Sequence, residues 1–140
     1  MPIEIYDLDN GLGVLIKGHG VVTNDEYSNT LKNHLTQDPD KIKKYRYSLS
    51  DYTEVTKAEV RTETIKFIAN LCISASKVNP NVVLATVSSQ DLIFGLSRMW
   101  EALSIETSWE IKVFKGKEEA KEWIAERVKT KWNITDLTWH

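Results

Sequence analysis

The amino-acid sequence predicts an α/β fold in which four helices cover a five-stranded mixed sheet that is mostly parallel. The first observation is the order of periodicities, because period-2 and period-3.6 patterns of apolar residues follow one another as ββαβαβαβα. The second is Val82–Val87, an almost continuous apolar run typical of a strand covered on both faces. The third is Asn10-Gly11, which separates the first two apolar runs and favours a tight antiparallel hairpin.

The amino-terminal part is predicted to hold this hairpin and one helix. Ile3 to Tyr6 forms the first strand, and the second runs from Leu12 and ends at Gly18. Thr23 to Glu26 has the sequence of a capping box, in which the Thr and Glu side chains pair with backbone N–H groups at a helix start. The helix that follows has a narrow apolar stripe, which we expect to face the sheet.

The centre of the chain is predicted as a strand, a polar loop and a long helix. After a solvated basic connection that begins at Lys41, apolar and polar residues alternate from Tyr45 to Ser50, as in a strand. The loop follows from Asp51. A second capping box, Thr56 to Glu59, then starts a helix that extends to Val78. We therefore expect Thr56 to be the N-cap of the long helix.

The carboxyl-terminal part is predicted to add two strands and two helices. Val82–Val87 is the fourth strand, and a polar segment from Ser88 caps the next helix. The fifth strand covers Trp109 to Phe114, and the last helix begins after Gly116. We expect residues 1–131 to form one domain. Residues 132–140 contain two tryptophans, which favours an ordered tail or an additional strand over a disordered end.

Composition excludes several classes of function. The chain has 140 residues and a net charge of −2, so no general positive field favours nucleic acid or an anionic membrane. Apolar runs stay well below the ~18 residues that a membrane-spanning helix requires. Cys72 is the single cysteine and cannot form an internal disulfide. We therefore expect a cytoplasmic protein that neither binds nucleic acid nor inserts into a membrane.

Motifs for catalysis and cofactor binding are missing from the sequence. It contains no glycine-rich phosphate loop, no G-x-S-x-G, no H-E-x-x-H and no pair of cysteines. Its three histidines offer little material for a catalytic triad. Asp51 and Glu54 lie close together, but acidic residues in loops are usually solvated. We therefore expect no enzymatic activity, no cofactor and no metal site.

Several segments together resemble the STAS-like (SpoIIAA-like) proteins, relatives of bacterial anti-sigma-factor antagonists. The segments that carry the resemblance are the hairpin, Gly20–Tyr27, Ser50-Asp51-Tyr52 before a long helix, Val82–Val87, Trp109–Phe114 and Glu119–Ile124. The resemblance implies a small cytoplasmic α/β domain that binds a partner protein or a ligand and does no catalysis. In phosphoregulated members, an Asp-Ser-[Ser/Thr]-Gly sequence carries the phosphorylated residue at a helix start. Here no Ser-Gly follows Asp51.

These observations lead us to expect a non-enzymatic regulatory domain that acts through protein–protein contacts. The alternative is a carrier or sensor of a small apolar or anionic ligand held between the sheet and the helices. Phe67 lies off the apolar stripe of the long helix, so a second surface must cover it. The candidates for this surface are the C-terminal tail, a second copy of the chain and another protein; a second copy is the simplest, which predicts a homodimer. The candidate partner- or ligand-binding residues are Asp51, Tyr52, Thr53, Thr56, Phe67, Met99 and Trp100.

Overall fold

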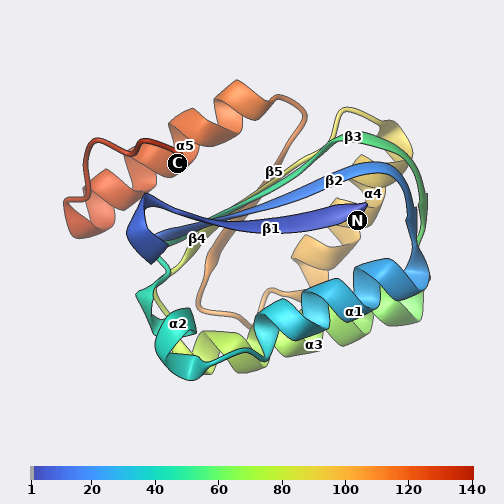
Figure 1. Cartoon of the computed structure of the whole chain (residues 1–140), viewed down its shortest axis with the longest axis horizontal. Coiled ribbons are helices and arrows are strands. Elements are labelled where there is room, and N and C mark those ends of the chain that lie inside the picture. Colours follow the sequence, from blue (N-terminus) through green and yellow to red (C-terminus); the bar gives the residue numbers. More distant parts are fainter. Residues whose placement is uncertain (1) are drawn as a thin grey trace.

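A computed structural model describes residues 2–140 and shows one five-stranded sheet with the order β1-β2-β3-β4-β5 (Figure 1). Within the part of the chain that the structure describes, only the β1–β2 pair is antiparallel, and the other three pairs are parallel. This confirms the predicted α/β class. The strands are β1 Ile3–Leu8, β2 Gly13–Thr23, β3 Tyr47–Glu59, β4 Val83–Val87 and β5 Glu110–Phe114. The helices are α1 Asn24–Leu35, α2 Pro39–Lys44, α3 Thr62–Val78, α4 Asp91–Leu103 and α5 Lys117–Trp132.

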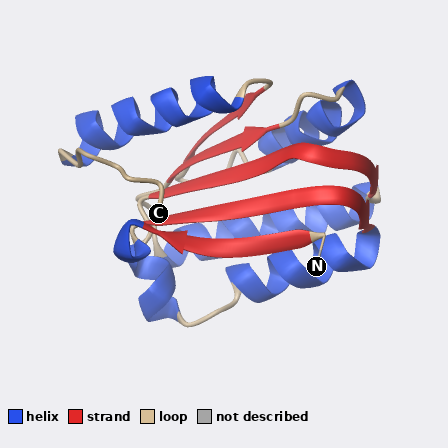
Figure 2. Cartoon of the chain, turned by 45° about the horizontal axis from the view of Figure 1, so that its top comes forward, coloured by secondary structure: helices blue, strands red, loops and turns tan. Residues whose placement is uncertain are grey.

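The helices divide between the two faces of the sheet. Figures 1 and 2 show α1 and α3 on one face and α5 on the other. The buried side chains form two clusters accordingly, one that includes Leu31, Ile68 and Trp100 from α1, α3 and α4, and one that includes Ile124 from α5. The short helix α2 is additional to the four that the sequence predicts. It occupies the segment predicted as a solvated connection, with Asp38 as its N-cap.

The predicted hairpin is confirmed, and its turn requires left-handed backbone. β1 pairs with β2 from Ile3 opposite Gly18 to Leu8 opposite Gly13. Between the strands lies the short helical turn η1, Asp9–Gly11. All three turn residues have positive φ, and Asn and Gly adopt this conformation more readily than other residues.

Strands β2 and β3 are much longer than the sequence predicts. β2 does not end at Gly18 but continues to Thr23, with irregular pairing near His19 and between Gly20 and Val21. β3 passes through the predicted loop and remains paired with β2 as far as Glu59, which lies opposite Thr23. Both strands are this long because the backbone N–H and C=O groups of each strand find their hydrogen-bond partners in the other.

Thr56 is therefore not a helix cap, and that prediction is wrong. It is exposed in β3, and α3 begins only at Thr62, with Arg61 at the N-cap position and no side-chain cap. In the other predicted capping box, the role of Thr23 is confirmed, because Thr23 Oγ1 accepts a hydrogen bond from the Glu26 N–H at 3.2 Å. The start predicted for α4 is confirmed in position, but Gln90 provides no side-chain cap there.

The carboxyl-terminal tail returns across the face covered by α5 and ends beside the hairpin turn (Figure 2). Its partly buried apolar side chains pack against the α5 cluster. Asp9 anchors it, because the Asp9 carboxylate accepts hydrogen bonds from the Thr138 N–H at 2.9 Å and the Thr138 hydroxyl at 2.5 Å. The Asp9 N–H donates to the carbonyl of His140 at 2.6 Å. The tail is thus ordered, and it forms no additional strand.

Candidate functional site

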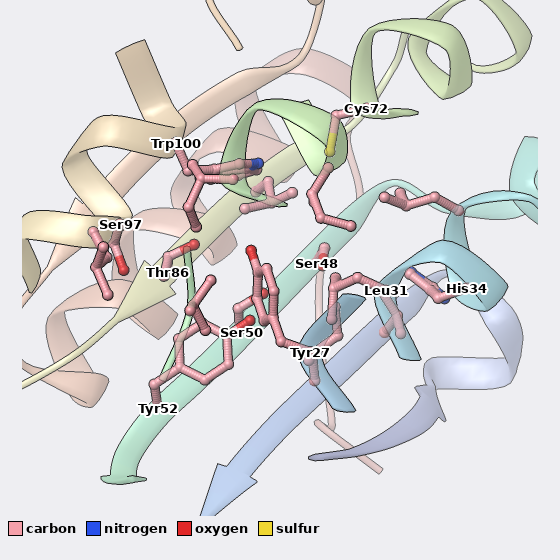
Figure 3. A pocket seen from close by; sticks show the side chains of 18 of the residues that line it. Tyr27, Leu31, His34, Ser48, Ser50, Tyr52, Cys72, Thr86, Ser97 and Trp100 are labelled. Carbon is pink, nitrogen blue, oxygen red and sulfur yellow. The ribbon is translucent and has the colours of Figure 1, made fainter. Parts of the chain in front are cut away.

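A cavity of about 100 Å³ lies between the central strands and the helices α1, α3 and α4 (Figure 3). Most of its lining is apolar and comes from the first core cluster. An apolar cavity of 150 Å³ in another protein holds benzene, so a cavity of this size can hold roughly four to six non-hydrogen atoms. Representative apolar lining residues are Ile16, Leu31, Ile68, Leu84 and Ile93.

Three hydroxyl side chains interrupt the apolar floor of this cavity. Ser48 and Ser50 project from β3 and Thr86 from β4, and all three are buried. Ser50 and Thr86 lie directly opposite one another in the parallel pairing. The neighbouring residues of β3, Tyr47 and Leu49, point to the other face, into the α5 cluster. Burying a hydroxyl is costly without a hydrogen-bond partner, and the Tyr52 side chain is such a partner for Ser50.

The helices add further polar groups above this floor. Figure 3 shows the Tyr27 side chain from α1 and the Trp100 side chain from α4 lying over Thr86 and Ser50. Trp100 is 8% exposed, and its Nε1 is buried without a hydrogen-bond partner. Burial raises the pKa of the nearby Cys72 thiol to about 12, and an interaction with Trp100 offsets this shift in part. A thiol sulfur is only a weak acceptor, and this contact does not have the geometry of a hydrogen bond, so the indole N–H is left without a partner.

His34 lines the opposite end of the cavity and is uncharged at neutral pH. Burial lowers the pKa of His34 to about 4, and Asp7 offsets this only in part. The Gln37 side-chain amide donates to His34 Nδ1 and to the Tyr45 hydroxyl, both at 3.2 Å, which assigns the His34 proton to Nε2. Tyr45 donates in turn to Asp7 at 3.1 Å. Within residues 2–140, no Asp, Glu, Lys or Arg side chain lines the cavity.

The arrangement of the chain matches a solved structure. It is similar over 87% of this chain and 91% of the other to a protein of the DUF3478 family from Shewanella loihica PV-4, with 20% sequence identity and a TM-score of 0.51. That protein is described as having a SpoIIAA-like fold. The chain has a SpoIIAA-like fold. No family model and no curated protein sequence matches the chain.

This SpoIIAA-like fold brings only two of the predicted site residues to the cavity. Tyr52 and Trp100 line it, from β3 and α4 respectively. Met99 packs against the same core cluster but is not part of the lining. Thr56 is exposed on β3, and Phe67 is 41% exposed on α3.

Asp51 and Thr53 form a separate cluster within β3, beside the carboxyl end of β4 and the start of α5. Asp51 is 1% exposed and accepts hydrogen bonds from the Thr53 N–H at 3.0 Å and the Thr53 hydroxyl at 2.6 Å. Lys117 Nζ lies 3.1 Å from its other oxygen. Burial alone would raise the pKa of Asp51, but Thr53 and Lys117 outweigh it and lower the pKa. This cluster fixes β3 to the start of α5.

Sequence reasoning missed the hydroxyl-lined floor and Tyr27. The signal was present, because Ser48 and Ser50 recur with period 2 in a buried strand and Thr86 interrupts the apolar run of β4. Among residues 2–140, no group of His, Cys, Asp and Glu is placed to hold a metal ion. None of the helices in this range has the length and apolar character needed to cross a bilayer.

Proposed function

We propose that the chain is a non-catalytic domain that carries or senses a small, neutral, mostly apolar molecule in the cavity beneath α1, α3 and α4. The observation that carries this proposal is the combination of an uncharged apolar cavity with hydroxyls at Ser50 and Thr86 and the unpaired N–H of Trp100. Ligand sites are typically apolar with a few placed polar groups. An anionic ligand fits less well, because no cationic side chain of residues 2–140 lines the cavity.

The protonation states of the lining residues favour binding over catalysis. At neutral pH, His34 with its pKa of about 4 cannot act as a general acid. The Cys72 thiol with its pKa of about 12 is not a nucleophile, because the thiolate is the reactive form. The pKa of Tyr52 is likewise raised to about 12 by burial. At pH 7 these groups are held in their neutral forms, which suits them to orienting a ligand by hydrogen bonds.

Thermal unfolding with neutral probes of four to six non-hydrogen atoms tests this function. At a probe concentration of ten times Kd, binding adds about 1.4 kcal/mol to the unfolding free energy and raises Tm by roughly 3–6 °C. Ala75→Met places a larger side chain in the cavity lining and should abolish the shift. Ala125→Met on the exposed side of α5 is the matched control and should preserve it. A wild-type protein that binds no probe would refute the proposal.

A second candidate function, protein–protein interaction, is favoured by the exposed aromatic ring of Phe67. Phe67 lies on α3 beside Arg61 and Glu63, where these residues border a shallow surface depression. An exposed aromatic side chain bordered by charged residues suits the centre of an interface. We infer that this surface pairs with a second copy of the chain, and sedimentation equilibrium at tens of micromolar tests this. Phe67→Glu should then yield monomers and Ala125→Glu should not, whereas a monomeric wild type would exclude the homodimer.

A further inference from the structure

We propose that the ligand of this cavity is a neutral molecule with a hydrogen-bond acceptor oxygen, such as a ketone, aldehyde or ester, to which the Trp100 N–H donates. This inference rests on the proposed function and specifies its ligand class. Trp100 Nε1 is buried and lacks a hydrogen-bond partner among residues 2–140. An indole N–H is a donor only, so the group that completes it must be an acceptor. Buried tryptophan N–H groups normally have such a partner.

A second tryptophan in the same lining has a hydrogen-bond partner, unlike Trp100. Trp109 also lines the cavity, but its Nε1 donates to the carbonyl of Asn79 at 2.7 Å. Ser97, one turn before Trp100 on α4, is likewise satisfied because its hydroxyl donates to the Ile93 carbonyl at 3.0 Å. Both of these lining groups are therefore paired, whereas the indole N–H of Trp100 is not.

The groups around Trp100 select a neutral acceptor. Figure 3 shows the Thr86 side chain below the Trp100 ring, with Tyr27 and Ser50 beside it. Hydroxyl groups can donate to a second lone pair of the same ligand oxygen. A carboxylate would be desolvated with no cationic partner among the described lining residues, and a hydrocarbon would leave the indole N–H unpaired. A carbonyl or ester oxygen is uncharged and also accepts a hydrogen bond from the indole N–H.

Cyclopentanone and cyclopentane are a matched pair of probes that differ by the acceptor oxygen. Each probe is titrated into ¹⁵N-labelled protein, and its binding is followed by NMR. The five tryptophan side chains give separate indole N–H resonances. We expect cyclopentanone to bind about tenfold more tightly, and the Trp100 indole proton to move downfield on binding. Trp100→Phe identifies that resonance and should remove the preference for cyclopentanone. Trp132→Phe, at the end of α5 on the other face, should keep it.

The outcomes separate this inference from the proposed function. Equal affinity for the two probes would overturn the acceptor inference and leave the ligand-binding function intact. A ketone-dependent shift of the Trp109 resonance alone would overturn it as well. If neither probe binds, because ordered water fills the cavity, both proposals fail. If Trp100→Phe does not fold, Thr86→Val is the second variant. The inference would also be overturned if Thr86→Val kept the full tenfold preference for cyclopentanone and the Trp100 resonance did not move on binding.

Discussion

Gly13→Ala is expected to destabilise the protein strongly, because the Tyr47 ring occupies the space of a side chain at position 13. Gly13 on β2 lies opposite Tyr47 on β3. A Cβ atom at Gly13 would lie 1.9 Å from Tyr47 Cζ and 2.3 Å from both Cε atoms. These distances are far below van der Waals contact, so the ring would have to move.

The surroundings of Tyr47 determine how costly that movement is. Its side chain is fully buried, its hydroxyl donates to the Asp9 carboxylate, and its ring meets the Trp139 ring edge-on at 5.1 Å. Overpacking costs about 1–3 kcal/mol, and a lost hydrogen bond to a charged group about 1.5–3 kcal/mol. Gly13→Ala should therefore lower the unfolding free energy by roughly 3–5 kcal/mol, a large share of the ~5–15 kcal/mol typical of a domain.

Urea unfolding followed by far-UV circular dichroism measures this cost in two backgrounds. In Tyr47→Leu protein, which lacks the ring, Gly13→Ala should cost less than about 1 kcal/mol, and the difference is the coupling energy of the pair. The reasoning is refuted if Gly13→Ala stays within about 0.5 kcal/mol of wild type. It is also refuted if the substitution costs the same with and without the Tyr47 ring.

Three further predictions concern a cap, a histidine and the central strand. Thr23→Ala should lower the unfolding free energy by about 1 kcal/mol, whereas Thr56→Ala on exposed β3 should change it by less than about 0.5 kcal/mol; equal losses in thermal melts would contradict the structure. The folded pKa of His34 is about 4, below its unfolded value near 6.5, so the unfolded state binds more protons between these pH values. Stability should therefore fall by about 2–3 kcal/mol from pH 6.5 to 4, and a His34→Gln protein with the same loss would argue against this. Val83→Asp should prevent folding because Val83 is fully buried in β4, and a wild-type melting temperature would disprove the central-strand assignment.

Local signals account for the parts of the fold that the sequence predicts correctly. The Asn10-Gly11 turn, the Thr23 cap and the apolar run of β4 each depend on neighbouring residues only. Their physical causes are positive φ in the turn, a side-chain acceptor for a free N–H, and burial of both strand faces. All three can therefore be recognised without knowledge of the tertiary structure.

The errors arise where distant pairing overrides a local preference. Thr56 to Glu59 has the sequence of a capping box, but the long β2 strand pairs with β3 across this segment and keeps it extended. The hydroxyl groups of the cavity floor were missed for a related reason, because the face to which Ser50 and Thr86 point depends on which helices cover each side of the sheet. Tyr52 and Trp100 were predicted as site residues, and the structure shows that both line the same cavity.

A crystal of the wild-type protein pressurised with xenon tests the central claim, that the cavity is open to a small neutral guest. Xenon enters preformed apolar cavities of comparable size. We predict a xenon site between β3, β4 and α4, within contact of Ile68 and Trp100, that is lost in Ala75→Met. Ordered water that xenon does not displace, or side chains that have closed the space, would contradict the account.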